Sequence, residues 1–128
     1  MNTSIVVLGS NIAPQKNIHQ AKKLISLRFK ILSETQWVKT KPIGITNQPD
    51  FINGAIFLQT ELIEEEFRRQ VKEIEHKIGR SPNSAHSYGP RVIDIDIIVW
   101  NNLVLNKDFY DRDFVRRLVL ELVPTVQY

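Results

Sequence analysis

Two aspartates lie two positions apart inside the apolar, β-branched run at residues 91–100. Such a run predicts a buried strand, and because side chains alternate across a strand, Asp94 and Asp96 share one face. Neighbouring carboxylates raise each other's pKa unless a counter-charge compensates them, and a divalent cation or arginines can do so. Arg80 and Arg91 lie nearby in the sequence. The pattern favours a site for Mg²⁺ and a polyphosphate, as in phosphoryl transfer.

The aspartates also have a simpler interpretation. An edge strand can carry charged side chains that face water and discourage pairing with another sheet. Gly89 and Pro90 argue against it, because they predict a turn that places Arg91 at the start of the strand. An edge strand without a ligand needs no arginine in that place.

Composition narrows the class of protein. The chain has 128 residues, which predicts a single domain over 1–128, and it has no cysteine, which excludes disulfides, thiolate zinc sites and a cysteine nucleophile. The formal net charge of +3 fits an anionic small ligand, and also a nucleic-acid surface. The sequence has no apolar stretch of about 18 residues and no charged secretory leader. We therefore expect a cytoplasmic protein with no membrane contact.

The elements that must position the aspartates follow the order βαββαβ. Strands are predicted at 3–8, at 29–40 with a bulge near Leu32 and Ser33, at 51–60 and at 91–100, and helices at 18–25, with Asn17 as N-cap, and at 62–78. This order predicts an α+β, ferredoxin-like antiparallel sheet with two helices on one face. The tail from Asp108 to Tyr128 is expected to fold back as a short C-terminal extension with one or two short helices.

Several short motifs follow one another along the chain. They are Leu-Gly-Ser-Asn at 8–11, Thr-Lys-Pro-Ile-Gly at 40–44, Gln-Pro-Asp-Phe-Ile-Asn at 48–53, Ile-Glu at 74–75, Gly-Arg at 79–80 and Gly-Pro-Arg-Val-Ile-Asp-Ile-Asp at 89–96. In this order and at these spacings, they resemble the 6-hydroxymethyl-7,8-dihydropterin pyrophosphokinase family over residues 5 to about 105. The resemblance implies a folate-pathway enzyme that transfers pyrophosphate from ATP to the pterin hydroxyl and releases AMP.

The resemblance also implies roles for individual residues. Asp94 and Asp96 would hold two Mg²⁺ ions and, with Arg80 and Arg91 on the phosphates, would be the catalytic residues. The implied ATP contacts are Lys72, Glu75, Arg80, Tyr88, Arg91, Ile97, Tyr110 and Arg116, and the implied pterin contacts are Thr40, Pro42, Ile43, Phe51, Asn53 and Tyr88. The implied partners are the pterin and ATP, without nucleic acid or membrane, and the implied state is a monomer or weak homodimer.

The tail departs from the family pattern, which usually has a Pro-His pair before Arg-x-Phe-Val-Leu-x-Pro-Leu. Here the histidine is missing, with Tyr110 as its expected replacement, Arg116 as the retained arginine and Leu118 in place of an aromatic residue. Two alternatives therefore stay open, a related phosphotransferase with another pterin-like acceptor and a non-catalytic pterin- or nucleotide-binding paralogue. An RNA-binding sheet is disfavoured, because the strands present isoleucine and aspartate in place of paired aromatics.

Overall fold

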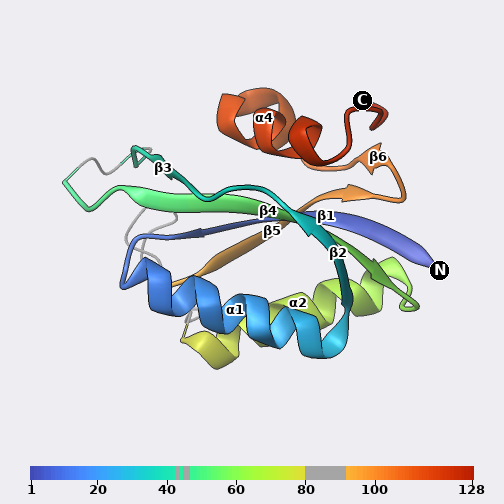
Figure 1. Cartoon of the computed structure of the whole chain (residues 1–128), viewed down its shortest axis with the longest axis horizontal. Helices are drawn as coiled ribbons and strands as arrows, with labels where there is room; N and C mark the ends of the chain where they lie inside the picture. Colours follow the sequence, from blue (N-terminus) through green and yellow to red (C-terminus); the bar gives the residue numbers. More distant parts are fainter. Residues whose placement is uncertain (43, 45–46, 80–91) are drawn as a thin grey trace.

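The computed structural model describes residues 1–42, 44, 47–79 and 92–128, which form a six-stranded sheet with helices on both faces (Figure 1). The elements in chain order are β1 (Asn2–Ser10), α1 (Pro14–Arg28), β2 (Lys30–Glu34), β3 (Val38–Thr40), β4 (Phe51–Thr60), α2 (Glu64–Ile78), β5 (Asp94–Trp100), β6 (Leu103–Val104), α3 (Asp108–Asp111) and α4 (Asp113–Leu122). The strand order is β2-β4-β1-β5-β6, and β3 also pairs with β4. Every pairing of these strands is antiparallel. The predicted ferredoxin-like α+β fold is confirmed.

Helix α2 illustrates how the sequence forms an element that covers the sheet. Its buried side chains Phe67, Val71 and Ile74 recur at helical spacing, so that one side of the helix is apolar. Three glutamates lie in its first turn, and His76 and Lys77 lie in its last turn, as the helix dipole favours. Gly79 ends the helix with a φ of 126°, a conformation that favours glycine.

Helices α1 and α2 cover the first face of the sheet, which lies below the strands in Figure 1. Alternate residues of the three central strands point into this layer, among them Val6, Leu8, Ile56, Leu58, Ile95 and Ile97. They pack against Ile18, Ala21 and Ile25 of α1 and Phe67, Val71 and Ile74 of α2. This apolar core lies against β5 from the first residues of the strand onwards and gives the strand a rigid support.

Helix α4 covers part of the second face, above the strands in Figure 1. Val115, Leu118 and Val119 pack with Phe109 in a second apolar cluster. On β1 and β4 this cluster extends as far as Val7 and Ala55 and includes no residue nearer the Gly9 end of β1. The predicted C-terminal extension therefore does fold back, and the structure adds that it builds a second core.

Local details agree with the sequence to different degrees. The register of β2 against β4 shifts between Ile31 and Ser33, which confirms the predicted bulge, and the predicted strand at 29–40 is divided into β2 and β3. The prediction of Asn17 as N-cap is wrong. Helix α1 begins at Pro14, because proline suits the first helical turn, and the Asn17 side chain donates to the Ile12 carbonyl at 2.5 Å from within the helix.

Candidate active site

The second face carries polar side chains where the α4 cluster ends. In the pairing of β1 with β5, Gly9 faces Asp94 and Val7 faces Asp96. On the other side of β1, Gly9 also faces Asn53 of β4. Opposed residues in antiparallel strands share a face, so both aspartates and Asn53 lie on the same side of the sheet as Val7. Strands far apart in the sequence are thereby brought together around Gly9.

The environment of Asp96 disfavours its negative charge. Burial, together with the charges of Asp94, Asp108 and Glu75, raises the pKa of Asp96 to about 7, while Arg112 acts in the opposite direction. A half-buried carboxylate near three other carboxylates favours a proton or a bound cation. The geometry thus gives Asp96 the electrostatic character that the spacing of the two carboxylates predicted.

Two hard carboxylate oxygen donors on one strand fit a magnesium ion. Among the described residues, no group of three or more histidine, aspartate or glutamate side chains could hold a metal ion. Mg²⁺ does not need such a group, because it commonly binds one or two carboxylates and completes its shell with water and substrate phosphates. The Asp94 and Asp96 pair therefore fits Mg²⁺ in the presence of a phosphorylated ligand.

The residues expected to bind the pterin lie next to the aspartates. Asn53 is 5% exposed, and its Nδ2 donates to Thr40 Oγ1 on β3. Phe51 is half-buried and pairs with Thr40, so it shares their face. A Cβ on Gly9 would lie 2.5 Å from Asn53 Oδ1 and 3.7 Å from Phe51 Cδ1. Gly9 therefore leaves the space that the Asn53 amide occupies. Pro42, which is half-buried, lies in the connection after β3.

The connection that leads into β4 is tied to the end of β1. Asn11 Nδ2 donates to Gln48 Oε1 at 2.7 Å and to the Pro49 carbonyl at 3.1 Å. Asn11 is buried and directly follows β1. These bonds join the Leu-Gly-Ser-Asn motif to the segment that places Phe51, which explains why two motifs distant in the sequence serve one site.

The residues expected to bind ATP are more dispersed. Lys72 is exposed on α2, whereas the Ile97 side chain is buried in the core of the first face. Tyr110 is 55% exposed on α3, on the other side of the sheet. Arg116 forms an ion pair with Asp113 at 2.5 Å. Among the implied ATP contacts that the structure describes, Glu75 is the one whose charge acts on Asp96.

Sequence reasoning missed two charged residues near the aspartates. Asp108 and Arg112 form an ion pair at 3.8 Å, and both charges act on the pKa of Asp96. Asn106 ties this pair to β5, because its Nδ2 donates to the Ile97 carbonyl at 3.3 Å and its Oδ1 accepts the Asp108 N–H at 2.9 Å. The signal for Arg112 was present, since the Arg-x-Phe-Val of the family pattern stands unaltered at 112–115.

Leu118 was expected to replace an aromatic residue of the family pattern at the site, but its side chain lies in the apolar core under α4. It is 4% exposed and packs in the α4 cluster, whereas Phe114 is half-buried at the margin of that cluster. If Arg112, and not Arg116, is the arginine of the family's Arg-x-Phe pattern, then the aromatic position of that pattern is Phe114 and not Leu118.

Four expected site residues, Ile43, Arg80, Tyr88 and Arg91, lie outside the described residues.

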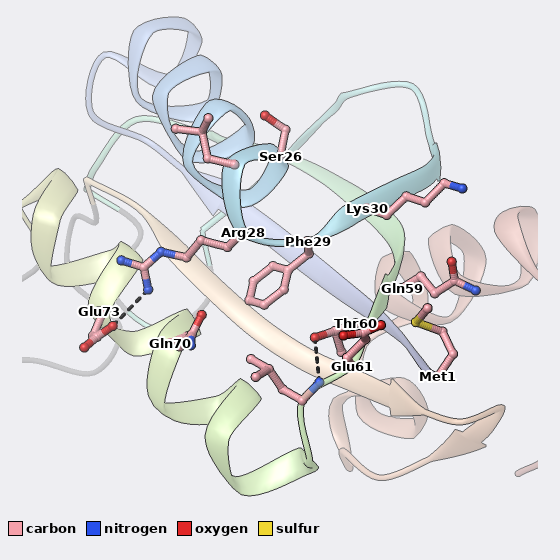
Figure 2. Close-up of a pocket in the computed structure, with 12 residues that line it drawn as sticks. Met1, Ser26, Arg28, Phe29, Lys30, Gln59, Thr60, Glu61, Gln70 and Glu73 are labelled. Carbon is pink, nitrogen blue, oxygen red and sulfur yellow. Dashed lines mark hydrogen bonds and ion pairs between the residues drawn. The ribbon is translucent and has the colours of Figure 1, made fainter.

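A pocket of about 1000 Å³ lies at the opposite end of the sheet (Figure 2). It is bordered by Phe29, by Thr60 at the end of β4 and by Met1, and the Arg28–Glu73 ion pair of 2.9 Å lies along one side. None of the expected site residues lines this pocket.

In the described part of the chain, no helix is long and apolar enough to cross a membrane.

Comparisons with known proteins identify the family of the chain. The family model described as 7,8-dihydro-6-hydroxymethylpterin-pyrophosphokinase matches residues 5–124. The 2-amino-4-hydroxy-6-hydroxymethyldihydropteridine pyrophosphokinase of Haemophilus influenzae is 29% identical over 126 residues, which cover 90% of this chain and 78% of that protein. The protein of the same name from Helicobacter pylori is 34% identical over 113 residues, covering 84% of this chain and 68% of its own length.

A third relative is larger. The bifunctional protein FolKE of Lactococcus lactis (strain IL1403) is 34% identical over 134 residues, and this chain covers 38% of it. The expected family resemblance is confirmed by the match over nearly the whole chain. This protein belongs to the 7,8-dihydro-6-hydroxymethylpterin-pyrophosphokinase family of diphosphokinases.

Proposed function

We propose that this protein transfers the pyrophosphoryl group of ATP to the hydroxyl of 6-hydroxymethyl-7,8-dihydropterin, as a single domain over residues 1–128. The observation that carries the proposal is the aspartate pair beside the Asn53 amide and the Phe51 ring, on one face of the sheet. One part of this arrangement suits a metal and phosphates, and the other suits a flat heterocycle. Family membership selects the pterin and ATP among the ligands with that chemistry.

Asp94 and Asp96 are the residues that would hold Mg²⁺, two ions in all. When bound, the metal supplies neutralising charge on the phosphate oxygens. We assign Arg112 to the phosphates together with Arg80 and Arg91. Arg112 is supported by its effect on the pKa of Asp96, and the other two by the family resemblance.

The reaction needs no covalent nucleophile on the protein. The pterin hydroxyl oxygen forms a bond to the β-phosphorus, the bond from that phosphorus to the oxygen bridging the α-phosphate breaks, and AMP leaves with the bridging oxygen. The hydroxyl proton is released. The protein contributes by holding the two substrates in line and by placing cationic groups around the phosphates.

For the pterin, we assign Phe51 to stacking and Asn53 to hydrogen bonds with the amide edge of the ring. Thr40 orients the Asn53 amide through the hydrogen bond between their side chains. The resemblance adds the backbone near Pro42 and Ile43, with Tyr88 at the boundary between pterin and ATP. Lys72, Glu75, Ile97, Tyr110 and Arg116 remain ATP contacts by resemblance.

The decisive experiment is product analysis. The purified protein is incubated with ATP, MgCl₂ and 6-hydroxymethyl-7,8-dihydropterin, and the nucleotides and pterins are separated. The expected products are AMP and a diphosphorylated pterin. ADP with a monophosphorylated pterin would contradict the proposal, and binding of Mg-ATP without turnover would favour a different acceptor or a binding paralogue.

We also propose that the protein works in the cytoplasm as a monomer or weak homodimer, with no nucleic-acid or membrane partner. The described helices include none that could cross a membrane, and the family has small-molecule substrates. Light scattering over a range of protein concentrations measures the oligomeric state. A stable dimer at the lowest concentration would contradict this assignment.

A further inference from the structure

In the part of the chain that the structure describes, the first residues of β5 have a strand on one side only. Strand β5 pairs with β1 from Asp94 onwards, whereas among the described residues β6 pairs only with Val99 and Trp100 at its far end. The backbone beside the aspartates therefore has an outer edge that no described strand covers. A buried N–H on such an edge needs another acceptor.

Glu75 of α2 supplies that acceptor. Its Oε2 accepts the Ile95 N–H at 2.7 Å, and Glu75 is only 3% exposed. A carboxylate that accepts a backbone N–H makes a short, strong hydrogen bond, and its burial makes that bond costly to lose. Glu75 thus links the last turns of α2 directly to the backbone of β5.

The position of this bond matters, because Ile95 lies between the two aspartates. Its N–H belongs to the peptide that joins Asp94 to Ile95, and its side chain is buried in the core of the first face. On the other side of the strand entrance, Ser10 Oγ donates to the Val92 carbonyl at 2.7 Å. The backbone that carries the carboxylates is therefore held by side chains from both α2 and β1.

We propose that Glu75 is a positioning residue, whose hydrogen bond to Ile95 sets the spacing of the Asp94 and Asp96 carboxylates for a divalent cation. This role differs from the direct ATP contact that the family resemblance implies, because the carboxylate is buried against the strand. It rests on the proposed function, since it takes the aspartate pair as the metal site. Substitution of a residue that orients metal ligands weakens metal binding by about 10- to 100-fold.

The test compares two substitutions that separate the effect of the length of the Glu75 side chain from the effect of its charge. Glu75→Gln keeps a side-chain oxygen at the same reach but removes the charge, and Glu75→Asp keeps the charge but is one methylene shorter. Ser4→Ala is the matched control, because it removes a buried bond of 2.7 Å to the Val99 carbonyl at the other end of β5. Mn²⁺ binding to the whole chain, without nucleotide, is measured by electron paramagnetic resonance, and melting temperatures are recorded in parallel.

We expect Glu75→Gln and Ser4→Ala to bind Mn²⁺ like the unaltered protein, and Glu75→Asp to bind about 10-fold more weakly. Ser4→Ala should nonetheless melt at a lower temperature, which separates a loss of stability from a loss of metal affinity. Normal binding by Glu75→Asp, or weak binding by Glu75→Gln, would overturn the proposal. Faster amide hydrogen exchange at Ile95 in Glu75→Asp is a second expected result that does not depend on metal.

The same measurements distinguish this inference from the proposed function. An unaltered protein that binds Mn²⁺ but releases no AMP would refute the function and leave the role of Glu75 standing. Unchanged Mn²⁺ affinity of Glu75→Asp in an active enzyme would refute the role of Glu75 alone. Absence of Mn²⁺ binding by the unaltered protein without nucleotide would refute the role of Glu75, whereas the proposed function is decided by product analysis with ATP present.

Discussion

The two faces of the sheet are built on the same three central strands but differ in role, because one holds an apolar core up to its end and the other holds polar groups there. On the first face, α1 and α2 bury an apolar layer that extends to Leu8 and Ile95, beside the aspartates. On the second face, the apolar cluster under α4 stops at Val7, and polar groups continue from there. One face therefore supplies most of the stability of this end of the sheet, which allows the other face to hold carboxylates that folding alone would not favour.

The largest effect is expected from Asp96→Asn, which removes one proposed metal ligand. Turnover should fall by about 1000-fold or more, because charge neutralisation at the phosphates is lost. The melting temperature above pH 7 should stay the same or rise, since a buried charge with neighbouring carboxylates is removed. Steady-state kinetics and calorimetry measure both, with exposed Glu121→Gln on α4 as the control. Near-normal turnover by Asp96→Asn would contradict the site.

Gly9→Ala tests the pterin side of the second face. Its new Cβ would lie 2.5 Å from Asn53 Oδ1, so the amide must move away from Thr40. We expect KM for the pterin to rise by about 10-fold, because an orienting hydrogen bond is lost, while KM for ATP changes little. Titration of each substrate at saturating levels of the other measures the two constants, and an equal rise in both would argue against a specific pterin role.

Gly54→Ala is the counterpart on the first face. Its Cβ would lie 2.5–2.8 Å from ring atoms of Trp37, which packs against the α1 and α2 core. We expect a loss of about 1–3 kcal/mol in the free energy of unfolding, from overpacking, with substrate KM values unchanged. Urea denaturation gives the free energy. If Gly54→Ala altered pterin KM as strongly as Gly9→Ala, the two faces would not be separable.

The smallest effect concerns pH. Because the pKa of Asp96 is raised to about 7 from 3.8, the folded protein holds a proton that the unfolded chain releases at lower pH. The contribution of Asp96 to stability is therefore present below pH 3.8 and is lost as pH rises towards 7. Without metal, the unaltered protein should lose more stability between pH 5 and pH 8 than Asp96→Asn, and added Mg²⁺ should reduce that difference. Identical pH profiles in thermal melts would contradict the raised pKa.

Much of the fold could be predicted from local sequence. The strand at 51–60 and the bulge near Leu32 were correct, and the helix predicted at 62–78 differs from α2 only in its first turn. These features depend on side-chain periodicity and on residues within one or two turns of each other. The N-cap of α1 was wrong because Asn17 and Pro14 both favour helix starts, and local preference did not decide between them.

The site was only partly accessible from the sequence. The shared face of Asp94 and Asp96 follows from strand alternation, which is a local property. The proximity of Arg112, the burial of Glu75 against β5 and the space that Gly9 leaves for Asn53 depend on contacts between residues at least 16 positions apart in the sequence. The sequence alone thus determined which chemistry the strand could carry. Only the tertiary structure decided which charges surround it, because burial and electrostatic coupling depend on the packing of distant elements.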